Sequence, residues 1–174
     1  MTPPPPAVGR ALWLVGVPAS GKTTLARAII ARLRHHGVCT LWLDSDDLRR
    51  VLTPSPSYDD EERDQFYRAI VHLAKLGVDG GATVVISATA HQRTWRESLR
   101  NQVNRLDEVW LAPSRDVVMR RDPKGLYRAA EAGEIDSLPG VDVAFEPPIH
   151  PALVFDTGAM SVEDMADVIL ARMF

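Results

Sequence analysis

The chain has 174 residues, of which 45% are hydrophobic and 25% are charged, so its composition fits one folded globular domain and excludes a disordered or fibrous protein. The net charge of -3 and the pI near 5.9 provide no general positive field, which argues against a nucleic-acid partner. No apolar run approaches the roughly 18 residues of a membrane-spanning helix, so we also expect no membrane partner. The single cysteine, Cys39, excludes an internal disulfide and fits a cytoplasmic protein.

Residues 1–9 contain four consecutive prolines and carry neither a basic leader nor an apolar segment, so we expect a disordered proline-rich tail. Residues 10–174 are then expected to form a single domain. Its first element is a continuous apolar run at 11–15 that ends in a glycine, a pattern typical of a strand buried on both faces of a parallel sheet. A helix is predicted next, because apolar residues recur at helical spacing from Leu25 to Leu33 before Gly37.

Strand and helix patterns alternate along the rest of the chain, which predicts an α/β fold with a parallel sheet of about five strands and helices on both faces. Residues 122–148 are rich in glycine, proline and charge without any sustained period, which is typical of a lid segment. The further predicted strands span 38–43, 82–86, 108–111 and 152–155. The further predicted helices span 46–52, about 59–80, 94–105, 115–121 and the segment from 161 onward, whose apolar stripe is Met165, Val168, Ile169 and Met173.

Residues 16–23, Gly-Val-Pro-Ala-Ser-Gly-Lys-Thr, match the pattern G-x-x-x-x-G-K-[ST] between the first strand and the first helix, which is typical of P-loop NTPase folds. Glycines let the backbone bring its N–H groups onto phosphate oxygens, and the helix N-terminus adds its positive dipole end. In such a loop the lysine bridges the β- and γ-phosphates and the threonine hydroxyl ligates Mg²⁺. The candidate nucleotide-binding residues are Gly16, Ala19, Ser20, Gly21, Lys22, Thr23 and Thr24. Binding alone does not specify transfer, because the same loop serves GTPases and ATP-driven machines.

Two carboxylates, Asp44 and Asp46, stand two residues apart at the end of the second predicted strand. Alternate strand residues point to one side, so both can face the sheet edge where open α/β sheets bind ligands. There they can hold Mg²⁺-bound water and accept a proton from an attacking hydroxyl. The alternative is that Asp46 or Ser45 caps the following helix. We favour the catalytic interpretation, with Thr23 and Asp46 as the Mg²⁺-binding residues, because the phosphate loop is adjacent.

Three blocks of sequence identify a family. The phosphate loop continues as T-L-A-R-A over 24–28, and L-D-S-D-D-L-R over 43–49 is similar to L-D-G-D-N-x-R. R-D-P-K-G-L-Y over 121–127, followed by A-G-E-I, P-G-V-D and E-P-P, is similar to a lid of the form R-D-x-K-G-L-Y-K…A-G-E…G-I-D…Y-E-x-P. From about Ala11 to Pro148 the chain thus resembles the adenylyl-sulfate kinases, which are P-loop kinases.

The resemblance implies transfer of the γ-phosphoryl group of ATP to the 3′-hydroxyl of adenylyl sulfate, giving 3′-phosphoadenylyl sulfate and ADP. ATP is then a co-substrate with Mg²⁺, the partner is a small molecule, and the family implies a homodimer. The resemblance assigns catalysis to Lys22, Asp46 and Lys124, and adds Arg121 to the ATP-binding residues. It assigns acceptor binding to Asp44, Arg49, Tyr58, Arg63 and Lys124, with Tyr58 where a phenylalanine stacks on adenine. These residue types suit the task, because arginines neutralise a phosphosulfate and a basic lid excludes water.

Three departures from the family fall on the acceptor side. Asp47 adds a negative charge where the family has asparagine, Phe66 replaces another asparagine, and Thr89-Ala90-His91-Gln92 stands where F-I-S-P is usual. The donor-side loop and the lid are intact, so the sequence constrains phosphoryl transfer more tightly than the identity of the acceptor.

Several alternatives therefore stay open. One is a kinase of the same family that acts on another nucleotide conjugate or a small hydroxylated metabolite, and another is a nucleotide-binding module without transfer activity. At the level of single residues, Arg49 and Arg63 can also be solvated helix charges, and Tyr58 can simply close a loop over the core.

Overall fold

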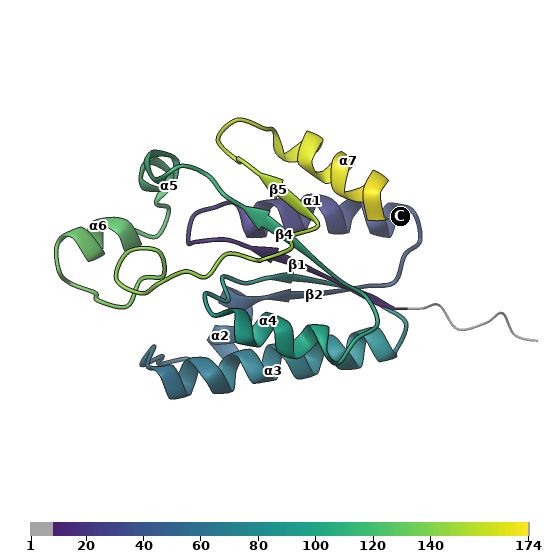
Figure 1. The fold of residues 1–174 in the computed structure, drawn as a ribbon, viewed down its shortest axis with the longest axis horizontal. Helices are drawn as coiled ribbons and strands as arrows, with labels where there is room; N and C mark the ends of the chain where they lie inside the picture. Colours follow the sequence, from purple (N-terminus) through teal and green to yellow (C-terminus); the bar gives the residue numbers. More distant parts are fainter. Residues whose placement is uncertain (1–8, 174) are drawn as a thin grey trace, which may run out of the picture.

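The computed structural model describes residues 9–173 and contains one parallel sheet of five strands in the order β2-β3-β1-β4-β5. The strands are β1 Arg10–Val15, β2 Thr40–Asp44, β3 Thr83–Ser87, β4 Leu106–Leu111 and β5 Leu153–Phe155. The helices are α1 Lys22–His35, α2 Ser45–Leu52, α3 Asp60–Asp79, α4 Arg93–Arg100, α5 Arg115–Arg121, α6 Leu126–Glu131 and α7 Val162–Met173. Figure 1 shows α1 and α7 on one face of the sheet and α2, α3 and α4 on the other. The predicted α/β architecture is confirmed.

The central strand β1 shows why the sheet is buried on both faces. Alternate strand residues point to opposite faces, so Ala11, Trp13 and Val15 pack with α3 and α4. Leu12 and Leu14 point the other way and pack with α1 and α7. Burial on both faces explains the continuous apolar run that predicts this strand, and it anchors the phosphate loop that follows it.

The structure corrects four details of the sequence predictions. The predicted tail lies outside the described residues except for Gly9, which is buried against the backbone of Val78 in α3. The helix predicted over 94–105 ends at Arg100, because 101–104 turn the chain toward the sheet and the Arg105 carbonyl oxygen already accepts from the N–H of Ala11 at 2.9 Å. Val168 is 40% exposed on α7, where Ala166 takes the buried place.

The fourth correction is α6, which lies inside the lid segment predicted to be irregular. This helix is only six residues long, too short to show a period in the sequence. The buried carboxylate of Asp122 starts it by accepting hydrogen bonds from the N–H groups of Tyr127 and Arg128 at 3.3 and 3.2 Å. Tyr127 then packs with Val118 and Leu138 in a small cluster of its own. Figure 1 shows α5 and α6 beyond the carboxyl ends of the strands.

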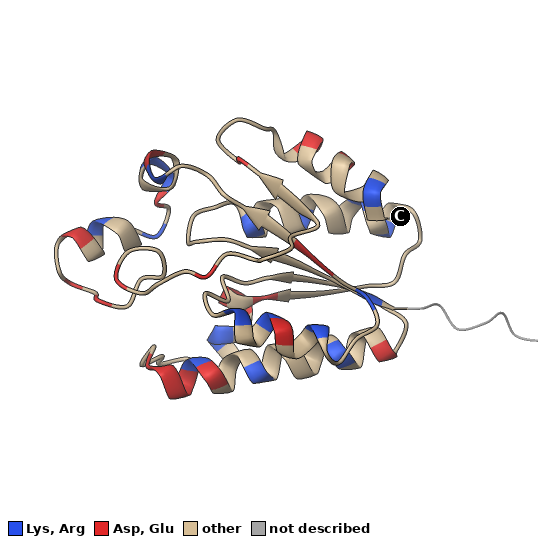
Figure 2. Cartoon of the chain, in the orientation of Figure 1, with Lys and Arg blue, Asp and Glu red and all other residues tan. Residues whose placement is uncertain are grey.

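Charged residues lie mostly on the helices and loops, as Figure 2 shows. The first turn of α3 carries Asp60, Glu61 and Glu62, which complement the positive end of the helix dipole. Within the described residues, none of the helices has the length and apolar character needed to cross a membrane.

The packing of α3 on the sheet generates a stability prediction. A Cβ atom at Gly77 would lie 2.7 Å from Cγ2 of Val84 and 2.8 Å from Cδ2 of Leu41, so Gly77→Ala should overpack this contact. We expect a loss of about 1–2 kcal/mol in urea unfolding, despite the better helix propensity of alanine. Gly80→Ala, at the same helix end with φ of -74° and only ordinary contacts, is the control and should change stability by less than about 0.5 kcal/mol. Equal effects of the two substitutions would contradict this account.

Candidate active site

A cleft of about 700 Å³ opens at the carboxyl edge of the sheet, between the phosphate loop and the lid. Ligands of open α/β folds bind at this edge because the loops and helix N-termini converge there. Its walls come from the phosphate loop, the start of α2, the start of α3, the segment after β3 and the lid. Most of the predicted site residues line it: Ala19, Gly21, Lys22, Thr23, Thr24, Asp46, Arg49, Tyr58, Arg63, Arg121 and Lys124.

The phosphate loop is held in a compact form by its own lysine. Nζ of Lys22 donates hydrogen bonds to the carbonyl oxygens of Gly16 and Val17, each at 2.9 Å. Gly21 has a φ of 99°, a left-handed conformation that suits glycine, and it directly precedes the first residue of α1. The loop therefore presents a cation and a helix N-terminus at the same point of the cleft, as anion binding requires.

Two predicted nucleotide-binding residues do not line the cleft. Gly16 lies beneath the loop, where a Cβ atom would stand 2.6 Å from the carbonyl oxygen of Leu111. Ser20 is fully buried, and its side chain also lies against Gly16. Both residues therefore support the loop from beneath. The sequence motif alone does not show whether a residue supports the loop in this way or contacts phosphate directly.

Asp44 also departs from its predicted place, because α2 begins immediately after it. The carboxylate is buried and caps α2, accepting hydrogen bonds from the N–H groups of Asp46 and Asp47 at 2.9 and 3.4 Å. Its other oxygen accepts from the hydroxyls of Thr23 at 2.9 Å and Ser87 at 2.7 Å. The prediction that Asp44 and Asp46 share one side is therefore wrong. Asp44 is not among the residues that line the cleft, and its assignment to acceptor binding stays a prediction. The predicted cap by Asp46 or Ser45 is wrong too, because Asp44 is the cap.

Asp46, by contrast, stands in the cleft with its side chain 48% exposed. Its carboxylate forms an ion pair with Nζ of Lys124, which the lid brings across from residues 122–148. The two partners are separated by 78 positions in the sequence, so the lid must be folded over the cleft for the pair to form. The three predicted catalytic residues, Lys22, Asp46 and Lys124, thus line one cleft.

Arg121 is joined to the phosphate loop by a residue that the sequence analysis missed. Its guanidinium donates to Oγ1 of Thr157 at 2.9 Å and to the Thr157 carbonyl oxygen at 2.5 Å. The Thr157 hydroxyl in turn donates to the carbonyl oxygen of Ser20 at 3.0 Å. Thr157 follows β5, so the rule that sites gather at strand carboxyl ends is the signal that points to it.

The opposite wall of the cleft is built around two arginines. The guanidinium of Arg49 lies 4.0 Å from the ring centre of Phe66 and 4.9 Å from that of Tyr58, and it forms a 2.8 Å ion pair with Glu62. The two ring faces and the Glu62 carboxylate together hold the Arg49 guanidinium in one orientation, so it is not free in solvent. Glu62 and the ring of Phe66 were not predicted as partners, because nothing in the local sequence couples α2 to α3.

Arg63 is buried and joins α3 to the lid. Its NH2 donates to the carbonyl oxygen of Ser137 at 2.6 Å, while burial lowers the pKa of its guanidinium. The alternative that Arg49 and Arg63 are solvated charges is wrong, because the side chain of Arg49 is only 16% exposed and Arg63 is 5% exposed. Tyr58 is 44% exposed at the cleft, with a φ of 59°.

The lid contacts the phosphate loop directly. The hydroxyl of Tyr127 donates to the carbonyl oxygen of Pro18 at 3.0 Å. Gly140 lies so close to Val17 that a Cβ atom would stand 2.7 Å from its Cγ1. The phosphate loop and the lid are therefore packed together, and both line the same cleft as the two arginines.

The extra acid at Asp47 does not enter the cleft. Its side chain is 63% exposed and pairs with Arg50 at 2.9 Å, one turn along α2. The added negative charge is therefore paired with Arg50 on the solvent face, and Asp47 is not among the residues that line the cleft.

Comparisons with known proteins agree with this geometry. The model of the adenylylsulphate kinase family matches residues 8–156. A probable adenylyl-sulfate kinase of Archaeoglobus fulgidus is 38% identical over 84% of this chain and 94% of its own length. The chain belongs to the adenylyl-sulfate kinase family. An adenylyl-sulfate kinase of Prochlorococcus marinus is 34% identical over 93% of this chain and 82% of its own length. The structure of the Mycobacterium tuberculosis APS kinase CysC in complex with AMPPNP and APS superposes with a TM-score of 0.89 at 28% identity, covering 97% of this chain and 99% of that one.

The charge of Lys22 generates a prediction about pH in this member of the adenylyl-sulfate kinase family. Burial lowers the pKa of Lys22 to about 8, although Asp46 and Asp44 oppose the shift and Lys124 adds to it. A bound phosphate favours the charged form of Lys22. Above its pKa the lysine of the free protein is mostly neutral, so ADP binding must then be accompanied by uptake of a proton. The affinity for ADP, measured by titration calorimetry, should be level up to about pH 7.5 and then fall toward tenfold per pH unit.

The matched variant is Lys22→Met, which cannot titrate. It should bind ADP weakly and show no such slope between pH 7.5 and 9.5. If the two proteins gave parallel curves, another group would be responsible and the assignment to Lys22 would be wrong.

Proposed function

We propose that the protein is an ATP-dependent adenylyl-sulfate kinase, which transfers the γ-phosphoryl group to the 3′-hydroxyl of adenylyl sulfate and releases ADP and 3′-phosphoadenylyl sulfate. Family membership supports the reaction, and one structural observation carries it for this chain. The same cleft is lined by a phosphate loop, an oriented arginine pair with an exposed tyrosine, and the Asp46–Lys124 ion pair that joins α2 to the lid. A donor phosphate and an acceptor hydroxyl can therefore meet at Asp46.

On the donor side, the loop supplies fixed positive potential for the triphosphate. When the triphosphate binds, Nζ of Lys22 leaves the carbonyl oxygens of Gly16 and Val17 and donates to phosphate oxygens instead. The negative phosphate favours the charged form of the lysine. Arg121 is held close to the same loop by Thr157. Because positioning and electrostatic stabilisation supply most of the catalysis in phosphoryl transfer, these fixed cations are the main donor-side contribution.

The chain also offers residues that suit Mg²⁺. Mg²⁺ usually keeps several waters and takes one or two protein oxygens together with substrate phosphates. The Thr23 hydroxyl and the Asp46 carboxylate fit this pattern, and Asp44 orients Thr23 through their 2.9 Å hydrogen bond. Among the described residues, no cluster of three His, Cys, Asp or Glu side chains could hold a metal by itself. The ion, when bound with the nucleotide, neutralises charge on the transferring phosphates.

On the acceptor side, Asp46 is the base. As the 3′-oxygen forms its bond to the γ-phosphorus, the bond from that phosphorus to the β–γ bridging oxygen breaks and ADP leaves. The hydroxyl proton passes to the Asp46 carboxylate, which is freed for this purpose when Lys124 turns toward phosphate. The arginine pair neutralises the phosphosulfate, and Tyr58 provides a face for the adenine. The lid keeps water away from the transferring group.

Two further expectations accompany this proposal. We infer a homodimer and a cytoplasmic location, both supported only by the family and the composition. Sedimentation of the purified protein at micromolar concentration would decide the first.

The direct test is turnover of purified protein with Mg-ATP and adenylyl sulfate. We expect ADP and 3′-phosphoadenylyl sulfate to form in equal amounts, because one phosphoryl group moves per cycle. Other nucleotides and small alcohols supplied in parallel should give at most slow release of ADP. ADP formation with one of those acceptors but not with adenylyl sulfate would replace the proposed acceptor, and no ADP with any of them would indicate a binding module.

The role of Asp46 is tested against its neighbour. Asp46→Asn should lower kcat by about 10²–10⁴-fold, the range for loss of a general base, while ADP binding measured without Mg²⁺ changes little. Asp47→Asn is the matched control, because that side chain points to solvent and pairs with Arg50. It should retain kcat within about twofold. Unchanged turnover in Asp46→Asn would show that another group accepts the proton.

A further inference from the structure

His91 is the departure from the family that the proposed function leaves without a role, and it lies in the cleft. It belongs to the segment between β3 and α4 and is only 3% exposed. The Ala90 N–H beside it donates to the hydroxyl of Tyr67 at 2.8 Å, and the His91 carbonyl oxygen accepts from the N–H of Glu146 at 2.8 Å. Both bonds fix the backbone, so the ring occupies a set position in the wall of the cleft.

The ring itself is also oriented by packing. It meets Trp95 edge to face, with the ring centres 5.0 Å apart and the planes at 80°. Trp95 is in turn stacked on Tyr67 at 4.2 Å and donates a 3.0 Å hydrogen bond to Asp64. These contacts hold the ring of His91 in a defined orientation.

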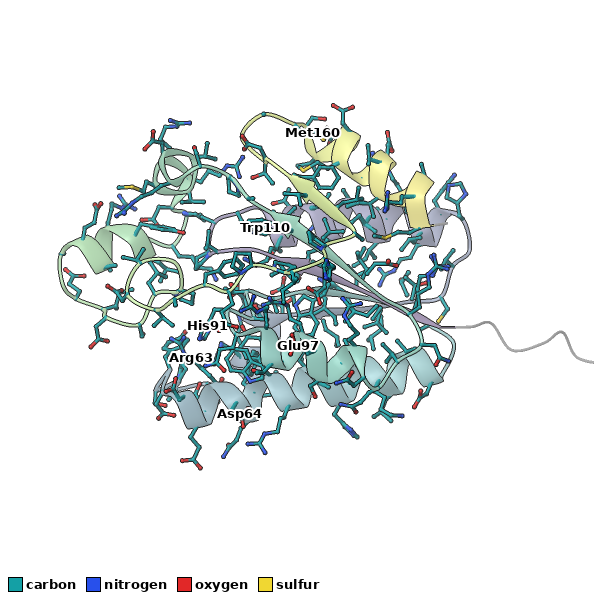
Figure 3. All side chains as sticks on the ribbon, viewed as in Figure 1. Arg63, Asp64, His91, Glu97, Trp110 and Met160 are labelled. Carbon is teal, nitrogen blue, oxygen red and sulfur yellow. The ribbon has the colours of Figure 1, made fainter. Side chains whose placement is uncertain are left out.

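Two buried nitrogens in this wall have no hydrogen-bond partner. Nε2 of His91 is enclosed without one, and so is Nε of Arg63, which lines the same cleft. The charge of Arg63 also acts on His91, and Figure 3 labels the two residues in the same part of the molecule, near the start of α3. Buried donors normally have partners, because an unpaired one costs free energy. Oxygens of an anionic ligand that enters this wall of the cleft would give the two nitrogens partners.

The protonation state of His91 suits a hydrogen-bonding role. Burial, followed by the charge of Arg63, lowers the pKa of the imidazole to about 4. The ring is therefore neutral near pH 7 and carries one N–H donor, which adds directionality without a further positive charge beside the arginine.

We propose that His91 is a specificity-determining residue of the acceptor subsite, where its Nε2–H and the Nε–H of Arg63 donate to oxygens of the sulfate-bearing end of the acceptor. The inference rests on the proposed function, since it assigns a group of adenylyl sulfate to a side chain of this chain. The neutral ring selects for an acceptor that presents an oxygen at this point, and an acceptor without the sulfate leaves the donor unpaired.

The test compares two substitutions at His91. His91→Phe keeps an aromatic ring against Trp95 and removes both nitrogens, so the KM for adenylyl sulfate should rise about tenfold, equivalent to about 1.4 kcal/mol. The kcat and the KM for ATP should stay within about threefold of the wild-type values. His91→Gln, which places an amide near Nε2, should recover most of the loss. His72→Gln, on the exposed side of α3, is the control and should change nothing.

Two outcomes would overturn the proposal. The first is an unchanged KM for adenylyl sulfate in His91→Phe. The second is an equal rise in the KM for ATP and in the KM for adenylyl sulfate, seen in both His91→Phe and His91→Gln, which would indicate that His91 only packs. Failure of the proposed function is distinguishable, because the wild-type protein would then not turn over adenylyl sulfate at all.

A second measurement does not depend on how the variants fold. In ¹⁵N-labelled wild-type protein saturated with ADP, the His91 Nε2 resonance should shift when adenylyl sulfate is added and stay in place when AMP is added. Equal shifts with both nucleotides, or none with adenylyl sulfate in an active preparation, would place the sulfate elsewhere.

Discussion

The site depends on one buried carboxylate at the end of β2. Asp44 accepts hydrogen bonds from the first turn of α2, from Thr23 of the phosphate loop and from Ser87 at the end of β3, so one side chain fixes three elements relative to each other. A buried carboxylate is tolerated only when its oxygens are fully paired, and here both are. The orientation of Thr23 and the emergence of Asp46 into the cleft both follow from this arrangement.

The cleft divides into two halves with different kinds of support. The half proposed to bind the donor is built from backbone and short-range contacts, in which Lys22 bonds to carbonyl oxygens five and six residues before it. The half proposed to bind the acceptor is assembled from side chains of α2, α3 and the lid, held by ring faces and ion pairs such as Arg49 with Glu62. Local contacts constrain the residues of the first half tightly, whereas single residues of the second half can be replaced one at a time. Phe66 and His91, which depart from the family, both belong to this second half.

This division explains what the sequence could and could not predict. The strands, the phosphate loop and its lysine follow from periodicity and spacing, because a sheet buried on both faces leaves a continuous apolar run. Asp44 lies at the end of its strand as predicted, but it does not share a side with Asp46, because the strand period stops where α2 begins, one residue later. The short helix α6 is missed because six residues are too few to show a period. The contacts of Thr157 with Ser20 and Arg121 join residues far apart in the chain, and no local pattern records them. The family resemblance supplied Lys124 and the arginines, whose partners only the folded chain shows.

The bond between Thr157 and the phosphate loop bears on where the chain can be divided. The phosphate-loop motif ends at residue 23. Thr157, however, hydrogen-bonds to the carbonyl oxygen of Ser20, 137 positions before it, and to the side chain of Arg121, 36 positions before it. A fragment that retains the motif and the lid but ends before β5 would lack this tie as well as the fifth strand. The support of the phosphate loop thus extends over nearly the whole chain, and a short N-terminal fragment would lack these contacts.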